Sequence, residues 1–386
     1  MGVMRVLWKA RKLRPLRTLA IIGAGGMALA GVGASVTAYA LWRRLTRGED
    51  MHGKVVLITG GSRGLGLAMA QEFAAAGARI VLCARDQREL DWAREELSRA
   101  GADVSPILCD VSNQDEVARM VNSTVEIFGR IDVLVNNAGV ITVGPLQTQT
   151  STDFQEAMDV MFRGTVYPTL AVLPHMLQRR SGRIANITSI GGKVAVPHLL
   201  PYDCAKFAAV GFSEGLHAEV ARYGVKVTTV VPGLMRTGSF VNAYFKGDNE
   251  AEYKWFSLSS AMPGLAMSGR RAARAVVRAI RQGRSEIVLT PQAKLLAMFH
   301  GLFPGVTADI LGVVNRVLPD DVAQPSSAVR EARERRTGKE SESALTLSPL
   351  TRFGREAAKE FHQYPERRGE SDGEAELPVE LRPKPA

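Results

Sequence analysis

Seven short aliphatic runs, separated by segments long enough to form helices, constrain the fold of this 386-residue chain most strongly. The runs are rich in Val, Ile and Leu, as buried strands are. Because a helix-length connection joins parallel rather than antiparallel neighbours, the pattern predicts a parallel sheet covered by helices on both faces. The expected strands lie at residues 55–58, 80–82, 104–108, 133–135, 184–187, 227–231 and 287–289.

The same alternation predicts the topology of the sheet. Crossovers between parallel strands are right-handed, and together they give a doubly wound, Rossmann-like α/β fold. Ligands of such sheets bind beyond the carboxyl ends of the strands. The motifs described below all follow predicted strands, so we expect them to meet along one edge of the sheet.

A glycine-rich turn follows the first predicted strand and reads Thr59-Gly60-Gly61-Ser62-Arg63-Gly64-Leu65-Gly66. Glycines at positions 60, 64 and 66 let the backbone turn tightly and approach a pyrophosphate. The helix expected from about Leu65 onward offers N–H groups to phosphate oxygens. Alone, such a turn is also compatible with an ordinary loop.

Tyr202 and Lys206 stand four residues apart, downstream of Ser189. Side chains at positions i and i+4 share one face of a helix, so the phenol and the ammonium can converge. A free phenol has a pKa of about 10 and needs help to ionise near neutrality. A neighbouring ammonium gives that help, which suits a tyrosine acting as acid or base.

Two further motifs are Asn136-Asn137-Ala138-Gly139 after the fourth strand and Pro232-Gly233 after the sixth. With the glycine turn, Ser189 and Tyr202-x-x-x-Lys206, they occur in the order and at the spacings of one family. Over residues 52–292 the chain resembles the short-chain dehydrogenases/reductases.

The resemblance implies hydride transfer between a nicotinamide and a carbonyl or alcohol carbon. Tyr202 would then exchange a proton with the substrate oxygen, which Ser189 would orient. Lys206 would favour the phenolate and hold the nicotinamide ribose. Ser189, Tyr202 and Lys206 are therefore the predicted catalytic residues.

The resemblance also implies a dinucleotide site. Asp110-Val111 would contact the adenine, Asn136 and Ala138 would line the adenosine side, and Thr237 would meet the carboxamide. The predicted cofactor-binding residues are Gly60, Ser62, Arg63, Gly64, Leu65, Gly66, Arg85, Asp110, Val111, Asn136, Ala138, Gly139, Tyr202, Lys206, Pro232, Gly233 and Thr237.

The choice of cofactor depends on the end of the second strand, where an acid favours NAD and arginines favour the extra phosphate of NADP. Ala84 stands at the position of the acid, Arg85 follows it, and Arg63 can reach the same pocket. NADP is therefore predicted over NAD. Asp86 comes two positions late and is expected to cap the helix that begins near Gln87.

One position departs from the family pattern. Met161 stands where the family usually carries an asparagine that steadies a water chain leading from the active-site lysine. A thioether donates no hydrogen bond, so this proton route must be altered or absent. The departure keeps a non-catalytic, cofactor-sensing function under consideration.

The substrate side is marked by an aromatic segment that follows Pro232-Gly233. Its six aromatic residues are Phe240, Tyr244, Phe245, Tyr253, Trp255 and Phe256. In this family fold the segment covers the substrate cleft, so an aromatic lid favours a bulky, lipophilic substrate. The alternative is a packed pair of helices with no ligand preference.

The N-terminus carries most of the net charge of +10, because residues 1–48 hold nine Lys/Arg and no Asp or Glu. Residues 18–42 are uncharged and long enough to span a bilayer, and arginines flank both ends. The sequence predicts a single-pass membrane anchor, with a cleavable signal at Ala38-Tyr39-Ala40 and an organelle-targeting peptide as alternatives. The preceding basic residues favour translocation of the domain, whereas free thiols and a nicotinamide cofactor favour the cytosolic face; we expect the cytosolic face.

The remaining composition excludes some classes of function. The body between the two charged ends is nearly neutral and has no basic nucleic-acid footprint. Cys83, Cys109 and Cys204 show no metal-ligand spacing and cannot all pair within one chain, so we expect reduced core thiols and no metal site.

These patterns divide the chain into four parts. They are a basic N-terminus with the anchor (1–48), a Rossmann-fold catalytic domain (49–292), an apolar helical segment (293–319) and a mostly disordered charged tail (320–386). The third part is expected to form two helices broken near Pro304-Gly305, which close the substrate pocket, rest on a membrane or pack on the sheet. A short amphipathic helix near residues 353–361 is expected as an exception within the tail.

Two functions are compatible with the sequence. The first is a membrane-anchored, NADP(H)-dependent oxidoreductase that interconverts a lipophilic carbonyl compound and its alcohol. The alternative is a non-catalytic or weakly active cofactor-binding scaffold. The resemblance further implies a homodimer or homotetramer.

Overall fold

The computed structural model describes residues 48–262, 264–319, 335–341 and 351–364. The predicted membrane anchor lies outside these residues. Among the helices that the structure does describe, none combines the length and the apolar character needed to cross a bilayer.

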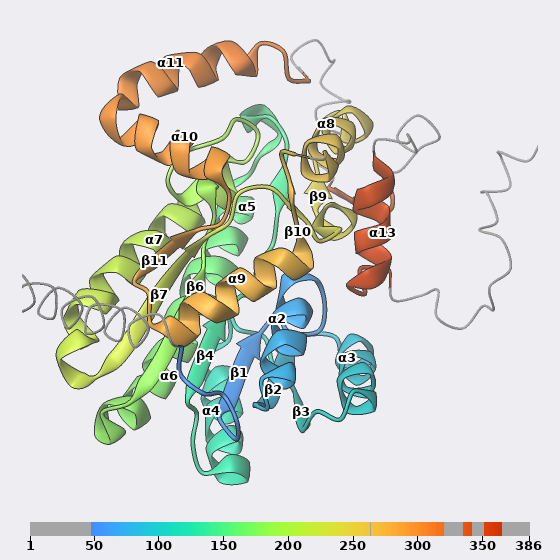
Figure 1. The fold of residues 1–386 in the computed structure, drawn as a ribbon. Helices are drawn as coiled ribbons and strands as arrows, with labels where there is room; N and C mark the ends of the chain where they lie inside the picture. Colours follow the sequence, from blue (N-terminus) through green and yellow to red (C-terminus); the bar gives the residue numbers. More distant parts are fainter. Residues whose placement is uncertain (1–47, 263, 320–334, 342–350, 365–386) are drawn as a thin grey trace, which may run out of the picture. The chain divides into compact units, whose positions relative to one another are not determined.

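A seven-stranded sheet forms the centre of the domain (Figure 1). Its strands are β1 (Val55–Thr59), β2 (Arg79–Ala84), β3 (Val104–Leu108), β4 (Val133–Asn136), β6 (Gly182–Ile187), β7 (Val225–Val231) and β11 (Glu286–Val288). The spatial order is β11-β7-β6-β4-β1-β2-β3, and every neighbouring pair is parallel. This order confirms the predicted doubly wound Rossmann topology.

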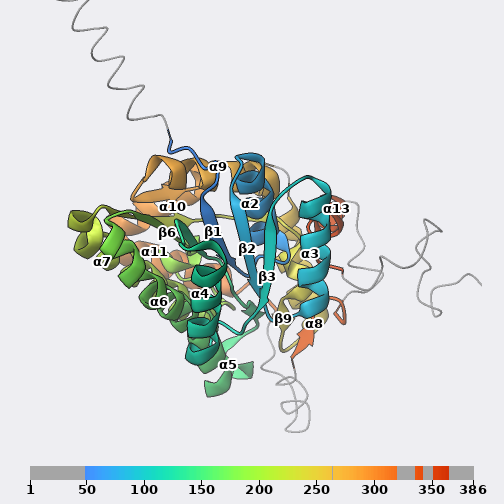
Figure 2. The same cartoon turned by 90° about the horizontal axis from the view of Figure 1, so that it is seen from below.

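Helices cover both faces of the sheet, as the view from below shows (Figure 2). The helices of the sheet domain are α2 (Gly64–Ala75), α3 (Gln87–Arg99), α4 (Gln114–Phe128), α5 (Ser151–Ala157), α6 (Gly164–Arg179), α7 (Leu200–Val220), α8 (Asn249–Ala261) and α9 (Gly269–Gln282). One core layer joins the sheet to α2, α3 and α9. The other joins it to α4, α6 and α7.

The alternation of side chains along β1 explains why both layers are apolar. Val56 and Ile58 face the layer of α2 and α9, whereas Val55 and Leu57 face the layer of α4 and α7. Successive strand residues point to opposite faces, so a strand buried on both sides must be apolar at every position. All five residues of β1 are buried, and the first four, residues 55–58, form a continuous aliphatic run for this reason.

Two small sheets lie beside the main one. The three-stranded sheet contains β5 (Thr142–Val143), β9 (Tyr244–Phe245) and β12 (Arg336–Thr337), and the two-stranded sheet contains β8 (Met235–Arg236) and β10 (Met267–Ser268). Strand β12 comes from the charged tail and pairs antiparallel with β9. The tail therefore contributes to the folded domain.

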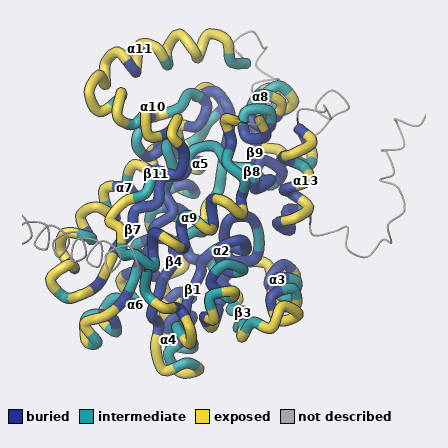
Figure 3. Tube along the Cα trace, in the orientation of Figure 1, coloured by how far each residue is buried: buried dark blue, intermediate teal, exposed yellow. Residues whose placement is uncertain are grey.

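In the C-terminal part of the chain, two helices are mostly exposed, whereas a third packs on the domain. Helices α10 (Pro291–Leu302) and α11 (Pro304–Asn315) are separated at Phe303 and expose most of their residues (Figure 3). Helix α13 (Arg352–Glu360) lies within the tail that was predicted to be mostly disordered, at the position of the expected amphipathic helix. Residues 335–341 and 351–364 pack on the domain, so for them the prediction of disorder is wrong.

The cysteines differ in burial. Cys83 and Cys109 are buried thiols, as expected, and the thiol of Cys83 donates to the backbone oxygen of Cys109 over 3.7 Å. Cys204 lies on an exposed part of α7. The prediction of a core thiol is wrong for Cys204, because its position on the helix faces away from the sheet.

Candidate active site

The glycine-rich turn joins β1 to α2 in a backbone conformation that suits glycine. Gly60 and Gly64 have φ angles of 62° and 59°, in the left-handed region. A Cβ atom on Gly66 would lie 2.0 Å from the backbone oxygen of Gly60, and one on Gly60 would lie 2.9 Å from the Cα of Ala138. This close packing fits a dinucleotide site, because a phosphate can approach only a turn without side chains.

Asn137 connects the glycine turn to the loop after β4, although it was not among the predicted site residues. Its Nδ2 donates to the backbone oxygens of Thr59 and Gly60, at 3.0 and 2.9 Å. The Thr59 hydroxyl in turn accepts from the N–H groups of Asn137 and Ala138. The Asn136-Asn137-Ala138-Gly139 motif carried this signal, but the sequence did not show which of its two amides makes the connection.

The side chain of Asn136 connects three elements of the domain. Its Nδ2 donates to Thr169 Oγ1 at 2.9 Å and to Asn186 Oδ1 at 2.8 Å, and the residue is buried. These bonds tie β4 to α6 and β6. The side-chain amide of Asn136 is therefore used inside the domain, and the placement of this residue on the adenosine side stays a prediction.

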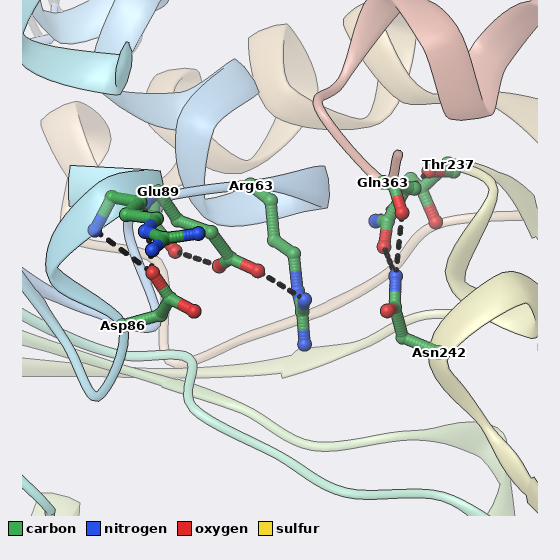
Figure 4. Close-up of polar contacts among 8 residues, drawn as sticks. Arg63, Asp86, Glu89, Thr237, Asn242 and Gln363 are labelled. Atoms are coloured by element: carbon green, nitrogen blue, oxygen red, sulfur yellow. Dashed lines mark hydrogen bonds and ion pairs between the residues drawn. The ribbon is translucent and has the colours of Figure 1, made fainter. Parts of the chain in front are cut away.

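Glu89 is a charged residue at the predicted adenosine end of the site, and sequence reasoning missed it. Its carboxylate accepts from Ser62 Oγ at 2.9 Å and from Arg63 Nη1 at 2.5 Å (Figure 4). The carboxylate is nearly buried, whereas the guanidinium is about one-third exposed. The structure thus brings the two predicted residues of the glycine turn together and adds an acid to them. No pattern around Glu89 indicates this, because the contact joins the glycine turn to α3, two segments that are separate in the sequence.

Arg85 and Asp110 also lie together at this end of the sheet. Arg85 Nη1 is 3.6 Å from Asp110 Oδ2, and both side chains are partly exposed. Burial raises the pKa of Asp110, but hydrogen bonds from Ser112 and the charge of Arg85 outweigh it and lower the pKa below its usual value. Asp86 accepts from the N–H groups of Arg88 and Glu89, which confirms its predicted role as the cap of α3.

The three predicted catalytic residues converge at the ends of β6 and α7. Ser189 stands two residues after the end of β6, close enough to Tyr202, in the first turn of α7, for its hydroxyl to lower the pKa of the phenol. The same hydroxyl accepts the N–H of Gly191 at 3.0 Å. Lys206 lies one turn further along α7, with Nζ 5.7 Å from the centroid of the Tyr202 ring. The helical spacing of Tyr202 and Lys206 therefore gives the predicted common face.

Burial controls the ionisation of this pair. Burial raises the pKa of Tyr202 to about 12, since the hydrogen bond from Ser189 only partly offsets it and the charge of Asp203 adds to it. Burial lowers the pKa of Lys206 to about 8. The Lys206 ammonium donates to the backbone oxygen of Ile187 at 2.8 Å. The protein chain by itself therefore keeps the phenol protonated at neutral pH.

Met161 lies in a π-helical turn between α5 and α6, over residues Met158–Arg163. The residue is buried, and a Cβ atom on Gly139 would lie 3.8 Å from its sulfur. Thr165 Oγ1 donates to its backbone oxygen at 2.8 Å. Such π-turns often mark functional sites. Here the turn places an apolar side chain beside the loop after β4.

The loop after β7 completes the predicted cofactor edge. The backbone oxygen of Pro232 accepts from Ile190 N at 2.7 Å, which links this loop to the segment after Ser189. Thr237 is buried, and its backbone oxygen accepts from Gln363 Nε2 at 3.2 Å. Val111, after β3, is buried against Gly164. A Cβ atom on Gly164 would lie 2.7 Å from Val111 Cγ2, so the packing leaves no room for a side chain there.

The aromatic segment is mostly a packed core. Phe240, Phe245, Tyr253 and Phe256 are buried and contact one another edge to face, with ring centroids 5.5–5.9 Å apart. Trp255 packs on Phe256 and donates its indole N–H to Glu252 at 2.6 Å. The structure thus supports the packed alternative for these side chains more than an aromatic lid.

Comparisons with known proteins agree with this geometry. The family model described as short chain dehydrogenase matches residues 54–245. A protein of Anopheles gambiae described as dehydrogenase/reductase SDR family protein 7-like is 38% identical over 251 residues, which are 64% of this chain and 77% of the relative. The chain belongs to the short-chain dehydrogenase/reductase family.

Other members of the family differ in their described activities. An 11-beta-hydroxysteroid dehydrogenase of Pinus massoniana is 36% identical over 55% of this chain and 59% of its own length. The crystal structure of a variant of actinorhodin polyketide ketoreductase with NADPH has a TM-score of 0.57 and 29% identity, covering 62% of this chain and 97% of the reductase. Membership makes this chain an oxidoreductase of a family that uses nicotinamide cofactors and acts on a small-molecule substrate.

Proposed function

We propose that this chain is a membrane-anchored, NADP(H)-dependent oxidoreductase that interconverts a lipophilic carbonyl compound and its alcohol. The convergence of Ser189, Tyr202 and Lys206 at the ends of β6 and α7 carries the proposal. A scaffold that only bound a cofactor would gain nothing from aligning a hydroxyl, a phenol and an ammonium at one point.

The residues divide the chemistry among them. A bound nicotinamide supplies or accepts the hydride. In reduction, Tyr202 gives its phenolic proton to the carbonyl oxygen; in oxidation, its phenolate removes the proton of the alcohol. Ser189, whose hydroxyl lies beside the phenol, orients the same substrate oxygen. Lys206 supplies the positive charge that favours the phenolate against the burial that raises its pKa.

The preference for NADP rests on Arg63 and Arg85. Both stand at the carboxyl ends of β1 and β2, where the adenosine ribose of this family lies. Each pairs with a carboxylate, Glu89 or Asp110, and keeps part of its guanidinium exposed. An arginine can bind a phosphate through two parallel hydrogen bonds, which a ribose hydroxyl does not match.

Arginine variants test this preference through the ratio of kcat/KM for NADPH to that for NADH. Arg63→Ala and Arg85→Ala should each lower the ratio by about tenfold or more, since a charge-assisted bond is worth about 1.5–3 kcal/mol. Glu89→Gln should raise it, because an acid beside the phosphate is removed. Unchanged ratios in all three variants would remove NADP from the proposal and leave the oxidoreductase.

The lipophilic substrate is supported by the relatives and by the active-site loop. The similar plant protein is described as a hydroxysteroid dehydrogenase. Beside Tyr202, the side chains of Ile141, Val196 and Leu199 form an apolar flank that packs on the aromatic cluster. Apolar walls with a few polar groups are typical of sites for such ligands.

Membrane anchorage is supported by the uncharged segment at residues 18–42 and its flanking arginines. Exposed apolar side chains on α10 and α11 add a second surface suited to lipid; Leu302 and Val313 are 72% and 60% exposed. We place the catalytic domain on the cytosolic side. Protease protection in sealed microsomes tests the side, and alkaline extraction of a variant that lacks residues 1–48 tests the anchor.

A Tyr202→Phe variant tests the reaction. The full chain in detergent, with NADPH and a panel of hydrophobic ketones and aldehydes, should oxidise the cofactor, and the variant should lose at least about 100-fold in kcat. Circular dichroism shows whether the variant is folded. Equal rates for the two proteins contradict the catalytic role of Tyr202.

Met161 favours a second candidate, a weakly active or non-catalytic cofactor-binding scaffold. Its thioether occupies the position at which the family usually carries a hydrogen-bonding asparagine. Burial also raises the pKa of Tyr202 to about 12, which disfavours the phenolate that oxidation needs. A scaffold would bind NADPH with ordinary affinity and turn over no carbonyl compound of the panel. That pair of results selects the scaffold over the enzyme.

Homodimers or homotetramers are proposed because family members commonly pair through the helices beside the active site. Two exposed apolar side chains on these helices, Leu170 of α6 and Phe207 of α7, support such a surface. Light scattering should show an assembly that Leu170→Glu with Phe207→Glu dissociates. A monomeric parent protein excludes this part of the proposal.

A further inference from the structure

The C-terminal strap, which we define as residues 351–364, is docked on the sheet domain by core contacts. Phe361 is 1% exposed and belongs to the core layer of α2 and α9. A Cβ atom on Gly269 would lie 2.6 Å from its ring. A Cβ atom on Gly238, whose φ is 71°, would lie 2.3 Å from the Cα of Ala358. The strap thus packs so closely on Gly238 and Gly269 that neither position can carry a side chain, which indicates a specific docking site.

The end of the strap connects the two loops that flank the dinucleotide site. On one side, the backbone oxygen of Phe361 accepts from Gly64 N, in the glycine turn, at 2.9 Å. On the other side, Gln363 Nε2 donates to the backbone oxygen of Thr237 at 3.2 Å. Asn242 Nδ2 donates to the side-chain and backbone oxygens of Gln363, at 2.6 and 3.1 Å (Figure 4).

Gln363 is the central residue of this connection. It is 3% exposed, and a Cβ atom on Gly64 would lie 2.8 Å from its Nε2. The side chain therefore lies directly over the start of α2 while it bonds the loop of Thr237. His362, with a left-handed φ of 55°, turns the backbone between the two contacts, and its Nε2 lies 2.5 Å from Glu96 Oε2.

The strap leaves hydrogen-bond donors of the glycine turn available. The first N–H groups of a helix have no partner within the helix and serve to bind phosphate. Within the glycine turn, the strap accepts only from the N–H of Gly64. The next two N–H groups, those of Leu65 and Gly66, make no hydrogen bond to another described residue. Its contacts are thus compatible with a diphosphate at the same turn.

We propose that the C-terminal strap closes the dinucleotide site over the cofactor diphosphate and slows cofactor release, with Gln363 joining the glycine turn to the loop of Thr237. The proposal rests on the assignment of this site to a nicotinamide dinucleotide. A cofactor held under the strap can leave only after the contacts of Phe361 and Gln363 open. Strap docking and cofactor binding then stabilise each other.

Two truncations of the full chain separate the strap from the residues beyond it. One stops after residue 350 and removes the strap; the matched control stops after residue 364 and keeps it. NADPH release is followed by the loss of cofactor fluorescence in stopped flow, with NADH in parallel, and affinity by fluorescence titration. We expect release at least tenfold faster from the shorter chain and no change in the control.

Point variants cover the case in which the shorter chain is unstable. Gln363→Ala removes the side-chain bonds to Thr237 and Asn242, while the backbone oxygen at position 363 still accepts from Asn242. Release should be about three- to tenfold faster, as expected for the loss of one to two hydrogen bonds. Hydrogen exchange of residues 351–364 in the parent chain should slow when NADPH is added. This second readout requires no turnover.

The results distinguish the strap from the site. A parent chain that binds neither NADPH nor NADH contradicts the cofactor assignment itself. If the parent binds and every folded variant releases cofactor at the parent rate, the strap proposal is wrong. Slower release or higher affinity without the strap also overturns it, because the strap would then compete with the cofactor.

Discussion

The Lys206 ammonium lies 5.7 Å from the centroid of the Tyr202 ring and donates a hydrogen bond to the backbone oxygen of Ile187, 2.8 Å away. The i, i+4 spacing thus places the two side chains on one face, while the end of β6 holds the ammonium. Burial opposes the charged form of both groups, lowering the pKa of Lys206 to about 8 and raising that of Tyr202 to about 12. Burial therefore disfavours both the phenolate of Tyr202 and the ammonium of Lys206.

Lys206→Met should abolish turnover while the fold persists. In the folded chain, Lys206 binds fewer protons than in the unfolded chain between pH 8 and about 10.4, so the parent's free energy of unfolding rises with pH in this window by up to about 1.4 kcal/mol per unit. The variant lacks this rise. Urea unfolding at pH 7.5 and 9.5 should show that the free energy of unfolding of the variant, minus that of the parent, falls as pH increases. If the two free energies change equally with pH, the lowered pKa of Lys206 is contradicted.

Met161→Asn should preserve or raise kcat. The asparagine amide adds a hydrogen-bond donor and acceptor at the π-turn, where the thioether adds none. Met161→Leu is the matched control, since it keeps an apolar side chain of similar volume. A folded Met161→Asn variant with abolished turnover, beside an active Met161→Leu variant, is the result that contradicts a missing proton route.

Asp203→Asn should stabilise the chain more at pH 8 than at pH 5. Burial raises the pKa of Asp203 to about 8, with one oxygen accepting from Val196 N at 2.6 Å and the other without a partner in the described chain. Between pH 4 and 8 the folded parent keeps a proton that the unfolded chain releases, so its free energy of unfolding falls as pH rises.

The amide does not titrate, so the stability difference between Asp203→Asn and the parent should widen across this window. Urea unfolding at pH 5, 6.5 and 8 measures it. The pH dependence of oxidation should also move to lower pH, because the charge of Asp203 contributes to the raised pKa of Tyr202. A constant stability difference contradicts the raised carboxyl pKa.

Lys246→Met should destabilise the fold by about 3–5 kcal/mol, because it leaves a buried carboxylate uncompensated. Lys246 Nζ lies 2.5 Å from Asp153 Oδ2, and both side chains are almost fully buried. Burial raises the pKa of Asp153, but its bonds from Lys246 and Thr150 outweigh it and lower the pKa. The double variant Lys246→Met with Asp153→Asn should recover part of the loss.

An exposed ion pair provides the control for Lys246→Met. Arg99 and Glu95 pair at 2.8 Å on the surface of α3, and Arg99→Ala should cost less than about 1 kcal/mol. Thermal unfolding of both variants compares the two pairs. Equal, small losses would show that the buried pair contributes no more than a surface pair.

Local patterns were sufficient to predict the sheet. The central strands are recognisable because burial on both faces favours aliphatic residues at successive positions, as at residues 55–58 of β1. The cap of α3 was equally predictable, since Asp86 bonds N–H groups two and three residues away. Such contacts involve only residues that are close in the sequence, so they can be predicted from the sequence without the tertiary structure.

The packing of the aromatic segment could not be predicted from local patterns. Composition gave the six aromatics of residues 240–256 but did not show whether they face a ligand or one another. In the fold, Phe240, Phe245 and Tyr253 share a cluster because β9, α8 and the preceding turn meet there. Periodicity within one segment cannot report which other segment covers it.

The sequence alone determined the parallel sheet, because its buried strands are aliphatic runs. It also determined the glycine turn and the candidate catalytic residues Ser189, Tyr202 and Lys206, because their spacing in the sequence is characteristic of the family. The tertiary structure decided that Glu89 pairs with Arg63, that Ile187 holds Lys206, and that Phe361 and Gln363 reach the glycine turn. These contacts join residues from separate elements, in the last case about 300 positions apart. Only packing brings them together, since no residue carries a local signal of a partner so distant along the chain.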